Sequence, residues 1–331
     1  MSTLPSARGP LSEALFAHLR GRDEYLDVSP AIAIPDPLGD DDLQLALYCC
    51  YELHYRGFVD VDDRYEWSPD VLSFRGALEE CFERALMKIV PHPEPERPIP
   101  EELFALAEVE DAPSVSRFVQ HRATLEQARE FLIHRSAYQL KEADPHSWAI
   151  PRLEGRAKAA LMEVQFDEYG SGDPDRIHAT LYARAMAAVG LDPSYGAYLD
   201  VIPGVTLATV NIMSLFGLHR RWRGAIVGHL AMFEMSSSIP NRRYAEGLRR
   251  LGFDGDATDF FDEHVVADSV HEMIAAHDLA GAFDDDETLR ADVVFGARAS
   301  IALDERWARH VVDAWEAGCP SLLGAVAGIV E

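Results

Sequence analysis

Apolar residues recur with helical rather than strand periodicity along nearly the whole chain. The pattern contains no convincing β-hairpin, no internal repeat and no heptad run long enough for a coiled coil. We therefore expect an all-α protein built as a helical bundle. The expected helices cover residues 40–57, 68–90, 101–142, 151–169, 174–189, 205–216, 220–236, 240–251, 256–281 and 287–317.

Local signals mark several helix ends and one boundary within the chain. Ser68-Pro69 and Asp173-Pro174 each place a capping residue before a proline that suits the first helical position. Residues 91–100, PHPEPERPIP, are rich in proline and should be extended and semi-rigid. The predicted organisation is therefore an N-terminal helical extension at 1–90, a Pro-rich linker at 91–100 and the main bundle at 101–331.

Composition and charge exclude several classes of partner. The 331 residues carry a formal net charge of −26, which disfavours binding to nucleic acid or to anionic membrane surfaces. The spacing of the four cysteines fits neither a zinc motif nor a secreted disulfide framework. No apolar run approaches the roughly 18 residues of a membrane span. We expect a cytoplasmic protein that acts on a small molecule.

The expected helix at 256–281 carries an unusual polar stripe. His264, Asp268 and His271 follow one another at i, i+4 and i+7, within about 60° of the helix circumference. Apolar residues surround this stripe, which offers two imidazoles and one carboxylate to a metal. An ordinary solvated helix face would show the same pattern.

Acids and a histidine on other helices extend this set. Glu234 lies in the apolar run GAIVGHLAMFEMSSSIP, where a buried carboxylate would need a metal, another cation or a proton. Glu168 and His178 flank a glycine-rich insert, so helical phase cannot decide whether they meet. All three residues could instead be exposed at the surface.

Together these residues form a candidate metal and catalytic set. Mixed carboxylate and imidazole ligation suits iron or manganese, and carboxylates can bridge two ions. No cysteine belongs to the set, which argues against structural zinc and an iron–sulfur cluster. The six residues are Glu168, His178, Glu234, His264, Asp268 and His271.

This order of residues resembles the haem-oxygenase-like di-iron oxidases and oxygenases, including those called iron-containing redox enzymes. Their signature is Glu and His, then a later Glu, then His-x3-Asp-x2-His. The chain matches it with Glu168-x9-His178, then Glu234, then the stripe that begins at His264, and the resemblance covers roughly residues 110–317. Residues that could replace the first pair are Glu163, Asp167, or Glu142 together with His146.

The resemblance implies a haem-oxygenase-like helical bundle that binds two non-haem irons and no haem. It implies O2 as co-substrate and an external reductant, with an electron donor and a second copy of the chain as candidate partners. Glu168, His178 and Glu234 would hold one iron, and the stripe would complete the centre. The preferred reaction is N-oxygenation of an amine or amino acid in specialised metabolism. The same centre could instead perform oxidative C–C cleavage or desaturation of an amino acid or fatty acid.

Two other classes of function remain open from the sequence. A helical protein of this kind could bind iron or a small ligand without catalysis, or could bind haem. In the N-terminal extension, residues 52–56 are either a substrate or dimer surface or part of a packing helix. Arg152, Arg242 or Arg243 could clamp a substrate carboxylate.

Overall fold

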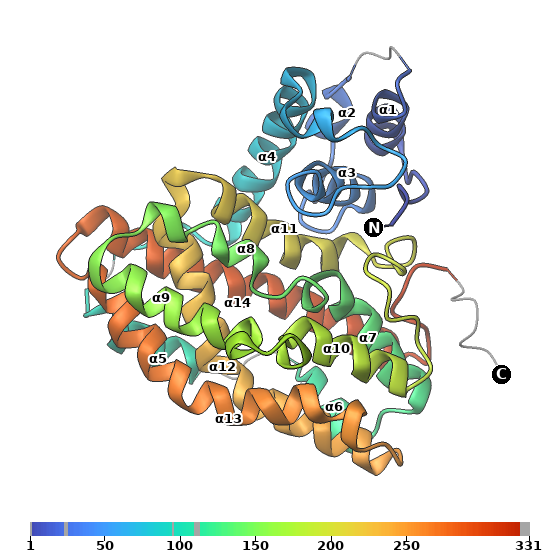
Figure 1. Cartoon of the computed structure of the whole chain (residues 1–331). Helices are drawn as coiled ribbons and strands as arrows, with labels where there is room; N and C mark the ends of the chain where they lie inside the picture. The colour runs from blue at the N-terminus through green and yellow to red at the C-terminus, as the bar shows by residue number, and fades with distance from the viewer. Residues whose placement is uncertain (1, 23–25, 95, 109–112, 325–331) are drawn as a thin grey trace.

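A computed structural model of the chain describes residues 2–22, 26–94, 96–108 and 113–324. Within these ranges the chain forms helices and turns and no strand, so the all-α prediction is confirmed. Helices and their connections fill the molecule (Figure 1). The α-helices are α1 Pro10–Leu19, α2 Ser29–Ile32, α3 Asp41–Glu52, α4 Pro69–Ile89, α5 Ile99–Ala107, α6 Val115–His121, α7 Leu125–Gln139, α8 Asp144–Ser147, α9 Gly155–Glu168, α10 His178–Ala188, α11 Gly204–Leu218, α12 Arg223–Arg250, α13 Asp259–Met273 and α14 Glu287–Glu316.

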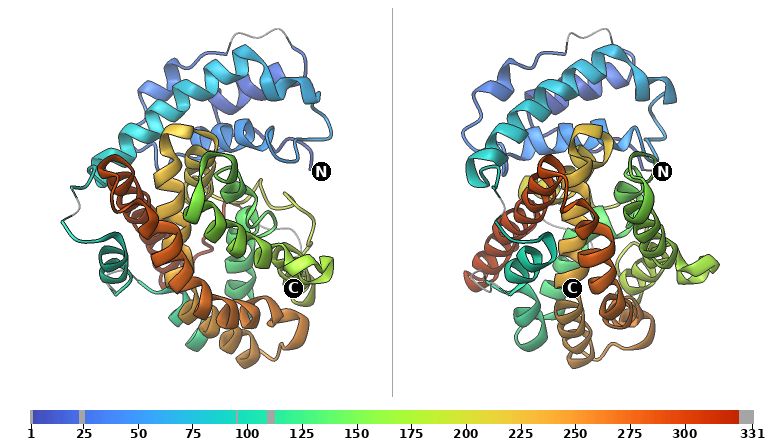
Figure 2. Two further views of the ribbon diagram at one scale, coloured as in Figure 1. Left: turned by 60° about the vertical axis from the view of Figure 1, so that its left-hand side comes forward. Right: turned by 90° about the vertical axis from the view of Figure 1, so that its left-hand side faces the viewer.

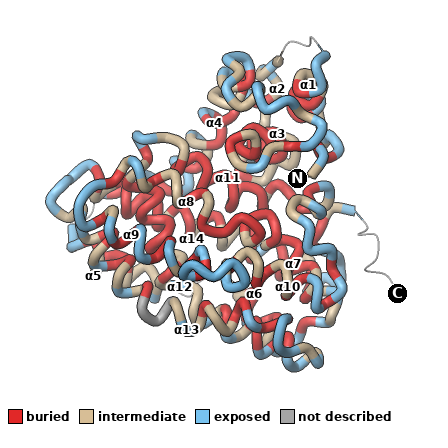
Figure 3. The backbone as a smooth tube through the Cα atoms, in the orientation of Figure 1, coloured by how far each residue is buried: buried red, intermediate tan, exposed pale blue. Residues whose placement is uncertain are grey.

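Helices α1 to α4 gather at one end of the molecule and cover the bundle there (Figure 2). Helix α3 is the centre of this group, because it packs on α1 and α4 and also on α11 of the bundle. Every residue of α3 from Leu43 to Glu52 is buried. Helix α11 is buried along almost its whole length (Figure 3). The described residues up to position 90 therefore pack directly on the bundle through α3. The status of 1–90 as a separate unit stays a prediction.

The long helices α12 and α14 cross in the interior of the bundle, and glycine makes the crossing close. A Cβ atom at Gly228 of α12 would overlap the carbonyl oxygen of Val293, and one at Gly296 of α14 would overlap that of Ala225. Only glycine leaves room for this approach of two backbones. The crossing fixes the position of α12, which carries Glu234 further along.

The stretch 101–142, expected to be continuously helical, is divided into α5, α6 and α7. A capping box starts α7, since Thr124 Oγ1 accepts from the Gln127 backbone N–H and Gln127 Oε1 accepts from the Thr124 N–H. The prediction was wrong here because the apolar periodicity continues across these caps.

Two further expected helices differ from the structure around α12 and α13. The two helices expected at 220–236 and 240–251 are replaced by the single helix α12, Arg223–Arg250, with Pro240 inside it. Packing against α6, α13 and α14 outweighs the helix-breaking cost of proline, about 3 kcal/mol. The helix expected at 256–281 ends as α-helix at Met273 and continues as a π-helical turn, Ile274–Leu279. Among the described residues, no helix is both long and apolar enough to cross a membrane.

Candidate metal centre

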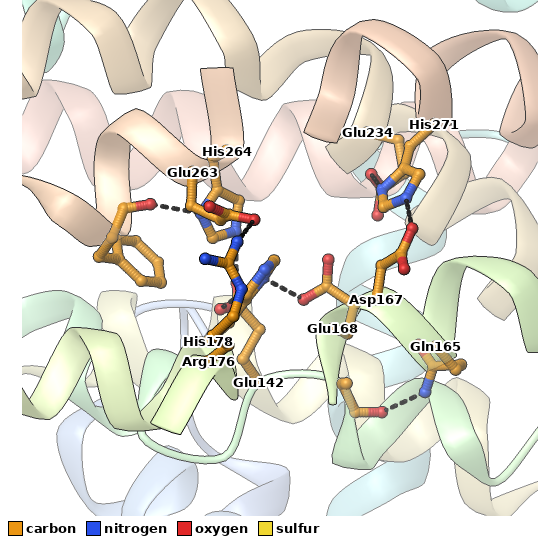
Figure 4. Close-up of polar contacts among 12 residues, drawn as sticks. Glu142, Gln165, Asp167, Glu168, Arg176, His178, Glu234, Glu263, His264 and His271 are labelled. Atoms are coloured by element: carbon orange, nitrogen blue, oxygen red, sulfur yellow. Dashed lines mark hydrogen bonds and ion pairs between the residues drawn. The ribbon is translucent and has the colours of Figure 1, made fainter. Parts of the chain in front are cut away.

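Five of the six predicted ligands converge in the interior between four helices (Figure 4). Glu168 is the last residue of α9 and His178 the first of α10, while Glu234 lies in the middle of α12. His264 and His271 lie two turns apart on α13. All five are buried, with at most 7% of each residue exposed. An exposed, solvated position is therefore wrong for each of these five residues.

The sixth predicted ligand, Asp268, lies on α13 between the two histidines, but its side chain is outside the described part of the structure. Glu142 joins the cluster instead, from the turn that follows α7. Its Oε1 is 3.6 Å from His264 Nε2, and its Oε2 is 4.0 Å from His178 Nδ1. Glu142 therefore adds to Glu168 and His178 rather than replacing them.

The sequence offered one signal for Glu142, the charged pair Lys141-Glu142 directly after the helical segment FLIHRSAYQL. Its expected companion His146 does not join the cluster and pairs with His229 of α12. Glu163 does not replace the first pair either, because it is exposed on α9. Asp167 contacts the cluster from outside, where its carboxylate meets His271.

The potential ligands form two groups that share one residue. Ligand atoms of Glu142, Glu168, His178 and His264 all lie within 4.8 Å of one another. Ligand atoms of Glu168, Glu234 and His271 meet the same limit. The division expected from the sequence therefore changes, because His264 groups with His178 while Glu234 groups with His271. Glu168 lies between the groups, where a carboxylate can bridge two ions.

Glycine explains how Glu168 and His178 meet across the insert that separates α9 from α10. Gly170 has a φ of 78°, and a Cβ atom there would lie 2.7 Å from the backbone nitrogen of Ile177. The tight connection formed by Gly170–Gly172 and Pro174–Arg176 brings the two helix ends together. As a result, His178 Nδ1 lies 2.9 Å from Glu168 Oε2.

Outer hydrogen bonds orient both histidines of α13. His264 Nδ1 donates to the carbonyl oxygen of Phe260 at 2.8 Å, so Nε2 is the nitrogen that faces Glu142. His271 Nε2 donates to Asp167 Oδ2 at 3.0 Å, and its Nδ1 lies 3.3 Å from Glu234 Oε2. Such partners fix the ring orientation that a metal-binding imidazole needs.

Burial dominates the electrostatics of the cluster. It raises the pKa of Glu142, Glu168 and Glu234, although neighbouring imidazoles oppose the shift. Burial, together with His264, lowers the pKa of His178 to about 4. Burial also opposes the charged form of His271, but the carboxylates of Glu234, Asp167 and Glu168 raise its pKa to about 9. Three desolvated carboxylates in one place would be stabilised by a bound cation.

Several buried atoms of the cluster also lack hydrogen-bond partners among the described residues. They are Glu142 Oε2, His178 Nδ1 and His271 Nδ1. The two histidine nitrogens approach a carboxylate oxygen closely, yet they are not aligned for a hydrogen bond. Lone pairs that gather without bonding one another suit a shared metal ion, so the residues present fit iron with mixed oxygen and nitrogen ligands.

A pocket of about 60 Å³ adjoins the cluster, with room for several water-sized groups. Four of the potential ligands form part of its wall, and α7, α8, α9 and α12 supply most of the remainder. The lining residues are Tyr138, Gln139, Glu142, Ala143, His146, Gln165, Glu168, Leu230, Phe233, Glu234, Ser237, Asn241 and His264. A small molecule in this pocket would lie directly against the candidate ligands.

Comparison with characterised proteins finds similarity to a nitrosourea synthase from Streptomyces achromogenes subsp. streptozoticus. The two sequences are 31% identical over 150 residues, which is 45% of this chain. The matched part is 31% of the nitrosourea synthase, so this chain spans about a third of that protein's length.

The sequence profile of the iron-containing redox enzyme family matches residues 129–305, more than half of the chain. The matched range includes every potential ligand from Glu142 to His271. This match confirms the predicted family and the haem-oxygenase-like all-α fold. The chain is an oxidoreductase that belongs to the iron-containing redox enzyme family.

Proposed function

We propose that the protein is an O2-dependent, non-haem di-iron oxygenase of specialised metabolism that N-oxygenates an amine or amino acid. The observation that carries this proposal is Glu168, whose carboxylate belongs to both groups of potential ligands. A carboxylate shared in this way supports a two-ion centre rather than two unrelated sites. The family supplies the coarser statement, that the enzyme uses iron for redox chemistry.

The choice of N-oxygenation is supported by the similar nitrosourea synthase, because a nitrosourea contains a nitrogen–oxygen bond. In the simplest reaction of this class, an amine, O2, two electrons and two protons give a hydroxylamine and water. The electrons require an external reductant, so a small electron-donating partner is part of the proposal.

The protein's own residues would have three tasks in this reaction. The residues that would hold the irons are Glu142, Glu168, His178, Glu234, His264, Asp268 and His271. Phe260 and Asp167 keep the two α13 imidazoles oriented through their hydrogen bonds. The pocket beside the cluster would hold the substrate nitrogen against the centre. Bound iron would supply the redox capacity and the open coordination positions that O2 activation requires, while the electrons come from the external reductant.

The test is anaerobic loading with Fe(II), iron counting, and exposure to ¹⁸O2 with a reductant and a panel of amines, amino acids and fatty acids. We expect two irons per chain and a product in which labelled oxygen is bonded to nitrogen. Products of oxidative C–C cleavage or of desaturation would show that the enzyme performs that reaction instead of N-oxygenation. Iron binding without substrate-dependent O2 consumption would identify a non-catalytic iron protein.

A further inference from the structure

The pocket beside the candidate centre has a mouth, which the exposure of its wall residues locates. Three of its lining residues, Gln139, Phe233 and Ser237, are partly exposed to solvent, and all the other lining residues are buried. A wall residue that also contacts solvent lies where a pocket opens. Gln139 is the last residue of α7, whereas Phe233 and Ser237 lie in the middle of α12. The mouth is therefore between the end of α7 and the middle of α12.

The mouth and the candidate centre share α12. Phe233 directly precedes Glu234, a buried potential ligand, and Ser237 follows Phe233 by four residues. Positions four apart on an α-helix lie one above the other on the same side. Phe233 and Ser237 thus border the mouth together, and Phe233 is the one that adjoins the centre. A molecule that reaches the centre through this mouth passes the Phe233 side chain.

Other rings hold the Phe233 ring against the pocket wall. Its centroid lies 4.3 Å from that of His229, 5.7 Å from that of Tyr138 and 6.4 Å from that of His146. Tyr138 and His146 line the pocket themselves, so the phenyl ring belongs to the wall and does not extend freely into solvent. Tilted and edge-to-face ring contacts at such distances are favourable. The ring is therefore a rigid part of the mouth.

The three side chains at the mouth differ in how easily they make room. The Ser237 side chain is a single hydroxymethyl group, so it occupies little of the opening. Gln139 has an unbranched side chain with several rotatable bonds, which can change rotamer. Phe233 is the bulky member of the three, and its neighbours fix its position. Its ring thus sets the width of whatever passes the mouth.

We infer that Phe233 is the specificity-determining residue of the pocket, because its ring limits the cross-section of the molecules that reach the candidate centre. This inference rests on the proposed function and narrows its substrate class. A nitrogen carried on a slender, unbranched chain passes the ring and leaves the rest of the molecule in the mouth. A nitrogen flanked by a bulky group, such as two phenyl rings on the adjacent carbon, is excluded.

Two amines of different width test this selection in the full chain, loaded anaerobically with Fe(II). We expect pentylamine to bind at least about ten-fold more tightly than diphenylmethylamine by calorimetric titration. Phe233→Ala should remove most of this preference and leave the iron count unchanged. Phe166→Ala is the matched control, because Phe166 is an exposed phenylalanine of α9 outside the pocket. An unchanged preference in a folded Phe233→Ala protein overturns the inference.

Thiol labelling tests the mouth without an amine and without reliance on the proposed function. Leu230→Cys places a reporter on the buried pocket wall, in a Cys319→Ser background because Cys319 is an exposed cysteine. We expect methyl methanethiosulfonate to react at least about ten-fold faster than its benzyl analogue, relative to their rates with free cysteine. Adding Phe233→Ala should remove most of this difference.

Leu248→Cys is the matched control reporter, because Leu248 is a buried leucine of α12 outside the pocket. It should stay unreactive toward both reagents, with and without Phe233→Ala. A reporter at position 230 that reacts with neither reagent, or that keeps the same size preference after Phe233→Ala, overturns the inference. Phe233→Leu, which keeps an apolar side chain, takes the place of Phe233→Ala if the latter does not fold.

Failure of the inference is distinguishable from failure of the proposed function. A protein that holds two irons and N-oxygenates amines, but whose size preference survives Phe233→Ala, keeps the proposed function and loses Phe233 as its selective residue. A protein that holds no iron, or only one ion, yet loses its preference between the two thiol reagents in Phe233→Ala, keeps the mouth residue and contradicts the proposed function.

Discussion

Glu168 ends α9 at the point where the two groups of potential ligands meet. Replacing this one carboxylate should therefore affect both ions. We expect Glu168→Ala to weaken Fe(II) binding by on the order of 100-fold or more, since even outer partners of metal ligands contribute 10- to 100-fold. Anaerobic competition with a chelator, together with iron counting, measures this effect.

Glu163→Ala is the matched control for Glu168→Ala, because Glu163 is exposed on the same helix. Its iron content and affinity should equal those of the wild type. Retention of two tightly bound irons in Glu168→Ala would show that this carboxylate is not shared between ions.

A second residue-scale prediction concerns His134, a fully buried histidine remote from the candidate centre. Its Nδ1 lies 2.8 Å from Thr206 Oγ1 and its Nε2 lies 3.0 Å from Ser321 Oγ. Burial, reinforced by His310 and Arg135, lowers its pKa well below the usual 6.5. Below pH 6.5 the unfolded chain therefore binds a proton that the folded chain excludes.

His134 should consequently make the metal-free protein less stable as the pH falls below about 6.5, by about 1.4 kcal/mol per pH unit. The free energy of unfolding can be measured by urea denaturation at several values between pH 7 and pH 5. Its slope against pH should be shallower in His134→Gln than in the wild type by about 1.4 kcal/mol per pH unit. His121→Gln, at an exposed position, should keep the wild-type slope. Identical slopes in all three proteins would mean that His134 titrates normally in the fold.

The sequence predicts ligands well where they share a helix and poorly where the helix ends. Helical phase alone places His264 and His271 on one face, and the apolar run around Glu234 predicts its burial. Glu142 follows the end of α7, next to Ala143 with a φ of 72°. Helical periodicity cannot be extrapolated past a residue with this backbone conformation. The sequence could therefore offer Glu142 only as a substitute for the pair Glu168 and His178.

At the scale of helices, the crossing of α12 and α14 depends on Gly228 and Gly296. We expect Gly228→Ala to lower the free energy of unfolding by about 3 kcal/mol or more, because the added methyl group meets backbone that cannot move aside alone. It should also weaken iron binding, since Glu234 lies six residues further along α12. Denaturant unfolding and chelator competition measure the two effects.

Gly76→Ala in α4 is the control for this prediction, because no atom outside its own helix backbone and chain neighbours lies within 4 Å of an added Cβ there. Helix propensity alone then applies, and the substitution should stabilise the protein by up to about 1 kcal/mol. If Gly228→Ala stabilised the protein as Gly76→Ala does, the close contact between α12 and α14 would not be important for stability.

The positions of most helices were predictable from the sequence, but their number and continuity were not, because ten helices were expected and the described residues contain fourteen α-helices. Ser68-Pro69 starts α4 as expected, and α14 matches its predicted range within one residue. Pro240 suggested a helix break that the structure does not have. The caps around Thr124 instead interrupt a stretch that was expected to be one continuous helix. In both cases tertiary packing or local hydrogen bonds, rather than periodicity, decided where a helix ends.

At the scale of the whole molecule, a buried ion pair joins the N-terminal helices to the bundle. Lys141 Nζ lies 3.2 Å from Glu52 Oε2, with each side chain 1% exposed. The aromatic rings of Tyr48 and Tyr55 face the ammonium group at 4.6 and 4.3 Å, and Tyr195 donates to Glu52 at 2.6 Å. The charged pair is thus enclosed where α3 meets the end of α7.

Removing one charge of this pair should be far more costly than removing both. We expect Glu52→Gln to lower the free energy of unfolding by about 3–5 kcal/mol, because Lys141 would stay buried without a counter-ion. The double variant Glu52→Gln/Lys141→Met should recover most of the loss. Equal stability of the single and double variants in urea would contradict this coupling.

Lys141 immediately precedes Glu142, so the N-terminal helices support a residue of the candidate centre from outside the range shared with the family, which begins at residue 129. This arrangement predicts how residues 52 and 141 change during evolution. A lineage that lost α3 would keep a lysine without its acidic partner, and selection should replace it with an uncharged residue. Positions 52 and 141 should therefore change together among relatives, while Glu142 stays the same in those with and without the extension.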